Sequence, residues 1–136
     1  MDTPSGNAFT FTKLVVDDLE AMADYYCAVF GLHRGSRHRF ERGVGGEPID
    51  EISLVERPGD PFGSLTLLRF LERAAGRADE TILGFTTRDL DGIVERVLAA
   101  GGSTISPVKE MPEQGIRVVF ARDPEGHLNE IVEMRS

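Results

Sequence analysis

The sequence predicts an α+β fold that consists of two βαβββ modules in tandem. The first observation is that a strand, a helix and a series of strands occur twice, in the same order. The letters repeat as well: "VVDDLEAM" at residues 15–22 resembles "TTRDLDGI" at 86–93, and "DPFGSLTLL" at 60–68 resembles "DPEGHLNEI" at 123–131. Because half of a 136-residue chain buries too little surface to fold alone, we expect the modules to pack together around a shared cleft.

The first module is predicted over residues 9–71 of a single domain that spans residues 1–136. A run of β-branched and aromatic residues at 9–16 predicts its first strand. Asp18 is a suitable N-cap, apolar residues recur after it at helical spacing, and Gly31 is typical of a helix end. The remaining strands of the module are predicted at 33–43, 49–55 and 65–71.

The second module is predicted over residues 81–135, after a polar linker at 72–80. Residues 81–87 alternate like a strand, and "RDLDGIVERVLAAGG" at 88–102 has an apolar helical face and ends in two glycines. Short strands are predicted at 103–107, 116–122 and 128–134.

The composition excludes several classes of function. The chain has 15 Lys and Arg against 23 Asp and Glu, which gives a net charge of -8 and a pI near 4.8. Nucleic acids are therefore not expected as partners, because their phosphates are bound by clustered basic residues. No apolar run approaches the roughly 18 residues that span a bilayer, and the first residues show no signal-peptide pattern, so no membrane is expected. With Cys27 as the single cysteine, these features predict a cytoplasmic protein.

Three segments resemble a known family: residues 14–32 ("LVVDDLEAMADYYCAVFGL"), 85–102 ("FTTRDLDGIVERVLAAGG") and 122–133 ("RDPEGHLNEIVE"). In them the chain resembles the vicinal-oxygen-chelate superfamily, which includes glyoxalases, bleomycin-resistance proteins and extradiol dioxygenases. The resemblance implies paired βαβββ modules that form a curled mixed sheet around a cleft. It also implies a homodimer, since relatives often complete their clefts across two chains, and the sequence leaves open whether one chain or two build this cleft.

The enzymes of this superfamily hold a divalent metal with ligands from the first and last strands of each module. Alignment on the repeat places these four positions at Phe11, Leu67, Ile82 and Glu130. Zinc needs at least three N, O or S ligands and magnesium needs several oxygens, so one carboxylate is too few. The resemblance, with these replacements, therefore predicts no metal and no other cofactor.

The three histidines offer no relocated metal site. His33, His38 and His127 lack the spacing of a zinc motif, and we expect all three at the surface.

A strand period of two places Phe11 and Lys13 on one face of the first strand, and the resemblance places Glu130 opposite them in the cleft. Glu130 then either acts as a general base or hydrogen-bonding anchor, or forms a structural ion pair with Lys13. Arg37 and Arg39 share a face of the second strand. They either hold a carboxylate or phosphate of a ligand in the cleft, or keep an edge strand soluble.

These features favour a metal-independent binding module for an unidentified small molecule, similar to bleomycin-resistance proteins. The first alternative is a glyoxalase-like lyase, isomerase or epimerase, with Glu130 as the base or a residual metal ligand. The second is a structural or regulatory protein without a small ligand, which a closed and fully packed cleft would indicate.

Overall fold

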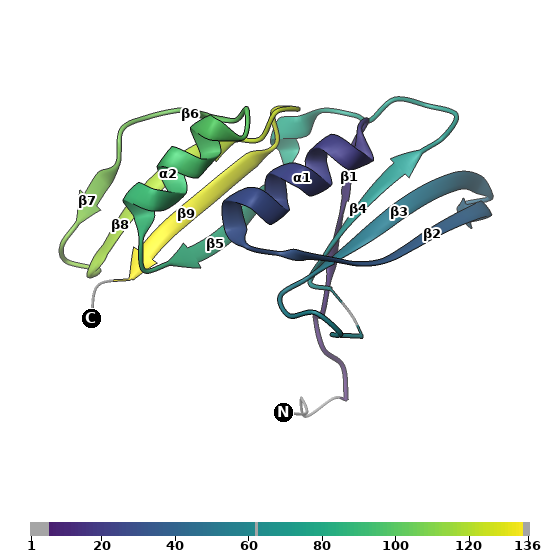
Figure 1. The fold of residues 1–136 in the computed structure, drawn as a ribbon, viewed down its shortest axis with the longest axis horizontal. Coiled ribbons are helices and arrows are strands. Elements are labelled where there is room, and N and C mark those ends of the chain that lie inside the picture. The colour runs from purple at the N-terminus through teal and green to yellow at the C-terminus, as the bar shows by residue number, and fades with distance from the viewer. Residues whose placement is uncertain (1–5, 62, 135–136) are drawn as a thin grey trace.

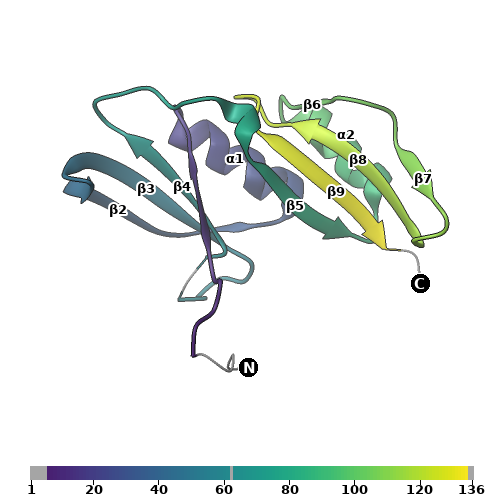
Figure 2. The same cartoon turned by 180° about the vertical axis from the view of Figure 1, so that it is seen from behind.

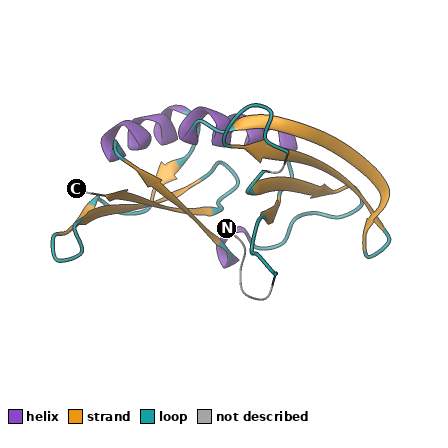
Figure 3. Cartoon of the chain, turned by 90° about the horizontal axis from the view of Figure 1, so that it is seen from below, coloured by secondary structure: helices purple, strands orange, loops and turns teal. Residues whose placement is uncertain are grey.

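The computed structural model describes residues 6–61 and 63–134, so the predicted end of the second module at residue 135 lies outside the described residues. The chain forms two mixed sheets side by side, with both helices on the same side of them and the opposite sheet faces open (Figures 1 and 3). The predicted α+β class is confirmed, and the two sheets do not close into a barrel. In the described part of the chain, no helix is long and apolar enough to cross a membrane.

The first module begins with β1 (Thr12–Val15) and α1 (Leu19–Phe30) and continues with β2 (His33–Val44), β3 (Glu47–Val55) and β4 (Leu65–Phe70). As predicted, the Asp18 side chain caps α1 by accepting a hydrogen bond from the Ala21 amide, and Gly31 ends the helix at a φ of 71°. The strand order is β1-β4-β3-β2, with β1 parallel to β4. The strands β1 and β2 are therefore the two edges of this sheet.

The second module consists of β5 (Ile82–Thr87), α2 (Leu90–Ala99), β6 (Ser103–Thr104), β7 (Lys109–Met111), β8 (Ile116–Arg122) and β9 (Leu128–Met134). A single turn of 3₁₀ helix, Ala78–Glu80, lies in the linker before it. The strand order is β5-β9-β8-β6, and β7 pairs with β8. The strand predicted at 103–107 is shorter than expected, and the unpredicted β7 is a brief pairing that apolar alternation does not mark.

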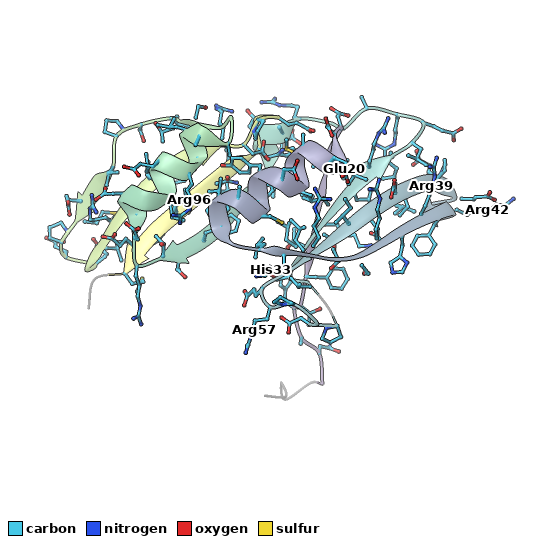
Figure 4. All side chains as sticks on the ribbon, in the orientation of Figure 1. Glu20, His33, Arg39, Arg42, Arg57 and Arg96 are labelled. Atoms are coloured by element: carbon cyan, nitrogen blue, oxygen red, sulfur yellow. The ribbon has the colours of Figure 1, made fainter. Side chains whose placement is uncertain are left out.

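One apolar core lies between the helices and the sheets and contains residues of both modules. Tyr26 of α1, Leu90 of α2 and Ile131 of β9 are fully buried in it. Each such side chain stabilises the fold by roughly 1.5–3 kcal/mol. Arg96 of α2, labelled in Figure 4, also donates a hydrogen bond to the Val29 carbonyl of α1. This shared core fixes the modules so that the edge strands β1 and β5 neighbour each other at the centre of the molecule (Figure 2).

A buried polar network also joins the modules, at the turn between β8 and β9. The Asp123 carboxylate accepts hydrogen bonds from the Tyr26 hydroxyl (2.7 Å) and from the backbone N–H of His127 (2.9 Å). Asn129 donates to the Tyr26 hydroxyl (3.2 Å) and accepts from the Tyr25 hydroxyl (3.0 Å). The network therefore connects α1 of the first module to β9 of the second.

The prediction that His127 lies at the surface is wrong, because its side chain is 4% exposed. Its Nδ1 lies 2.8 Å from the Asp123 carboxylate, and its Nε2 lies 3.1 Å from the Val15 carbonyl. Burial opposes a charge on the ring, but the hydrogen bond and charge of Asp123, with the Val15 carbonyl, outweigh it and raise the pKa of His127 above its usual 6.5. The imidazolium donates a hydrogen bond from each ring nitrogen, which matches its two acceptors, the Asp123 carboxylate and the Val15 carbonyl. His33 and His38 are exposed, as predicted.

Candidate functional site

Phe11, the first of the four predicted positions, lies between two pockets and lines both of them. The residue just precedes β1, and its side chain is 41% exposed. The first pocket, of about 390 Å³, lies between the edges of β1 and β5. Its walls are mainly apolar and include Phe11, Leu32, Leu65, Ile82 and Phe85. The structure thus brings together Phe11 and Ile82, which the repeat alignment places at equivalent positions.

The second pocket, of about 290 Å³, lies on the open face of the first sheet and is more polar than the first, although Phe11 and Pro61 also line it. Lys13, Thr66 and Ser53 form a row across β1, β4 and β3, because Lys13 pairs with Thr66 and Thr66 with Ser53. Ser36 and Glu51 line the same pocket. The sequence analysis missed Ser36, Glu51, Ser53 and Thr66. Alternation along 49–55 places Glu51 and Ser53 on one face, but it does not reveal that this face is the open one.

Lys13 forms an ion pair with Glu51, with 2.8 Å between Nζ and Oε2, and its Nζ also lies 6.0 Å from the centre of the Phe11 ring. The predicted alternative, a structural ion pair between Lys13 and Glu130, is therefore wrong. Glu51 is two strands away from β1 in the same sheet, whereas Glu130 belongs to the other sheet.

Glu130 lies on the open face of the second sheet, half-buried. Its neighbours Asn129 and Ile131 are buried beneath the helices, so alternation turns Glu130 to the opposite face. It pairs with Gly84 of β5, where an added Cβ would meet no described atom within 4 Å. Glu130 therefore faces open space. Glu130 belongs to β9, the strand next to β5, and β5 lines the first pocket. Glu130 itself is not among the residues that line either pocket.

Leu67 does not line the cleft as predicted. It pairs with Leu14, is fully buried and packs in the shared core under the helices. Lys13 pairs with Thr66, and Gly84 pairs with Glu130, so Thr66 is the structural equivalent of Glu130. The segment from the D-P-x-G turn to this position is one residue shorter in the first module, from Asp60 to Thr66, than in the second, from Asp123 to Glu130. A one-residue shift in a strand moves every side chain to the other face, which explains the error.

Arg37 and Arg39 share one face of β2, as predicted, but it is the face toward the helix α1 and not the open face. Arg37 donates to Asp50 (2.9 Å) and to Glu20 of α1 (2.9 Å). The Arg37 hydrogen bond holds the pKa of Asp50 below its usual value. Figure 4 shows Arg39 and Arg42 toward the outer end of the β2–β3 hairpin. These arginines are therefore outside the cleft and cover an exposed edge strand.

The donor set does not fit the metal site of the superfamily's enzymes. With Thr66 in place of Leu67, the four positions hold two apolar side chains, one hydroxyl and one carboxylate. Within residues 6–61 and 63–134, no three His, Cys, Asp or Glu side chains are grouped so that they could hold a metal ion. One carboxylate and one threonine are fewer ligands than zinc, magnesium or calcium require.

Comparisons with known proteins agree with this fold. A crystal structure of a glyoxalase family protein from Bacillus cereus shares 22% identity and a TM-score of 0.79, over 93% of each chain. TioX from Micromonospora sp. ML1 shares 23% identity and a TM-score of 0.65, over 93% of this chain and 98% of that one. The fosfomycin resistance protein FosX from Mesorhizobium loti shares 17% identity and a TM-score of 0.63, over 93% and 92%.

At these identities the structures establish the fold and not a shared activity. The search of curated proteins found no match. The sequence model of one family, however, matches residues 8–131, which is most of the chain. The protein belongs to the Glyoxalase/Bleomycin resistance protein/Dioxygenase superfamily.

Proposed function

We propose that the protein binds a small molecule in the two pockets around Phe11, without a metal ion. The observation that carries this proposal is the replacement of the metal-binding positions by Phe11, Thr66 and Ile82, with Glu130 as the one remaining carboxylate. The first pocket offers an apolar surface of the kind that binds small ligands. An open pocket of this size also argues against a purely structural role, for which a packed cleft would be expected.

The enzymatic alternative receives less support from the geometry. A general base must reach the proton that it removes, directly or through one water. Glu130 stands one strand behind the wall of the first pocket and faces away from the shared core. Within this chain it is therefore poorly placed to act on a ligand held against Phe11 and Ile82.

The proposal includes a homodimer. The open sheet faces carry large apolar side chains, including Ile82 at 53% and Met134 at 58% exposure. Both lie on the open face of the second sheet, toward its two ends, because Ile82 pairs with Leu128 and Met134 pairs with Ile116. A second copy of the chain would cover the open face of the second sheet, in keeping with the symmetric assembly that is commonest among soluble proteins.

The first experiment measures metal content in protein purified without a His tag and without added metal. We expect iron, nickel, zinc and manganese each far below one per chain. The melting temperature should not change with EDTA or with added divalent ions. One bound metal per chain, whose removal lowers the melting temperature, would contradict the proposal and favour the enzymatic alternative.

A screen of uncharged and charged small molecules by thermal shift then tests binding itself. Ligands should raise the melting temperature of the protein and of a Leu98→Ala control, because Leu98 lies on α2, away from the pockets. They should lose this effect in Phe11→Ala, which removes the side chain that both pockets share.

A further inference from the structure

The two pockets that meet at Phe11 differ in chemistry, and this difference restricts what can fill them together. The walls of the first are mainly apolar and lie between β1 and β5. The second lies on the open face of the first sheet, where hydroxyl groups, the Lys13–Glu51 ion pair and His38 line it beside Phe11 and Pro61. A ligand that occupies both must therefore have one apolar end and one polar end.

The polar pocket contains hydroxyl groups that the protein itself does not satisfy. Thr66 is 8% exposed, and its side chain makes no hydrogen bond to any residue that the structure describes. The same holds, within the described chain, for the side chains of Ser53 and Ser36. Thr66 is buried, Ser53 is half-buried and Ser36 is exposed, so the three hydroxyls line the pocket at increasing exposure and are free to bond to a ligand. These three groups therefore favour a ligand that both donates and accepts hydrogen bonds.

The charges of Lys13 and Glu51 balance each other in the polar pocket, and the imidazole of His38, which also lines it, adds a further hydrogen-bonding group. The Lys13 ammonium is 2.8 Å from the Glu51 carboxylate, and both residues line this pocket. An anionic ligand would have to compete with Glu51 for Lys13, and a cationic ligand would have to compete with Lys13 for Glu51. Because a paired lysine offers little net attraction, the pocket favours a neutral polar group over a phosphate or a carboxylate.

We infer that the ligand is an uncharged amphiphile, with a ring or chain against Phe11 and Ile82 and a hydroxyl- or amide-bearing end over Thr66 and Ser53. This inference rests on the proposed function and names the chemical class of its ligand. Pockets of about 390 and 290 Å³ suit two linked groups of modest size rather than one long chain.

Three probes with the same ring and different polar ends test the inference by titration calorimetry at pH 7. They are 4-methylumbelliferyl glucoside, 4-methylumbelliferyl phosphate and 7-methoxy-4-methylcoumarin, whose ends are a neutral polyol, an anion and an apolar ether. We expect the glucoside to bind at least tenfold more tightly than either of the others. The double variant Ser53→Ala/Thr66→Val should bind the glucoside and the ether with equal affinity.

Thr86→Val is the matched control, because Thr86 is an exposed strand residue that lines neither pocket. It should leave all three affinities unchanged. The melting temperatures of the variants show whether each one folds. Tightest binding by the phosphate would overturn the inference and indicate an anion site. Equal binding of the three probes would overturn it too, while leaving metal-independent binding in place. Binding of none would refute the ligand class, and the metal measurement and thermal-shift screen would still decide the proposed function.

Discussion

At the scale of single residues, small displacements along a strand decide which chemistry reaches the cleft. Thr66 and Leu67 are adjacent, yet Thr66 lines the polar pocket and Leu67 is sealed in the core. The same alternation separates Glu130 from the buried Asn129. Asn129 belongs to the buried polar network. The hydroxyl groups of Tyr25 and Tyr26 both form hydrogen bonds inside this network, so each depends on a buried partner.

The two tyrosines form a natural comparison for a stability measurement. Tyr26→Phe removes a hydrogen bond to the charged Asp123 and leaves the Asn129 amide without its acceptor, so we expect a loss of about 2–3 kcal/mol in the free energy of unfolding. Tyr25→Phe removes one bond to the neutral Asn129 and should cost about 1 kcal/mol. Urea unfolding monitored by circular dichroism measures both losses, and equal losses would show that Asp123 does not depend on Tyr26.

At the scale of elements, the turn between β8 and β9 holds the two modules in place. Glu125 accepts hydrogen bonds from the backbone amides of Asp17 and Asp18, just before α1 begins (2.9 and 2.7 Å). His127 reaches the Val15 carbonyl at the end of β1. The D-P-x-G turn of the second module therefore contacts the start of the first module at several points.

This arrangement predicts a dependence of stability on pH. The pKa of His127 is raised in the folded protein, so its contribution is complete below its unfolded pKa of about 6.5 and is lost as the pH rises through the folded value. The carboxylates of Asp123 and Glu125 favour the charged ring, and Lys13, Arg73, Arg77 and Glu80 line the pocket beside it. We expect the free energy of unfolding to fall as the pH rises from about 6.5 toward the folded pKa.

A His127→Gln variant provides the comparison. It should be less stable than the parent at pH 6, and the difference should shrink as the pH rises, measured by urea unfolding at a series of pH values. The exposed His33 gives a control in His33→Gln, which should retain the pH dependence of the parent. A constant difference between His127→Gln and the parent across this range would show that the pKa of His127 is the same in the folded and unfolded protein.

At the scale of the whole molecule, both helices cover one side of the sheets and leave the other faces open (Figure 3). Met134 lies on the same open face as Glu130, because the two are four residues apart in β9. If a second copy covers this face, a charge at Met134 weakens the association. Light scattering after size-exclusion chromatography should give about twice 14.9 kDa for the parent and a lower mass for Met134→Lys.

Leu98→Lys is the control for this measurement, since Leu98 is equally exposed, at 57%, but belongs to α2 on the opposite side of the sheet. Its mass should equal that of the parent. A monomeric parent at micromolar concentration would refute the homodimer, and the ligand pockets, which lie within one chain, would be unaffected.

The sequence by itself determined the order of the elements apart from β7, the caps of α1 at Asp18 and Gly31, and the family, because these depend on local periodicity and on short motifs. Residues 116–122 and 128–134 form strands with the predicted boundaries. It also places apolar residues, Phe11 and Ile82, at two of the four positions where the superfamily's enzymes hold a metal. Only the tertiary structure decided which side chains meet in the cleft. It turned Thr66 outward, placed the Arg37 and Arg39 face against α1, paired Lys13 with Glu51 and buried His127. These outcomes depend on strand register and on the packing of the two modules, which long-range contacts set and local patterns do not reveal.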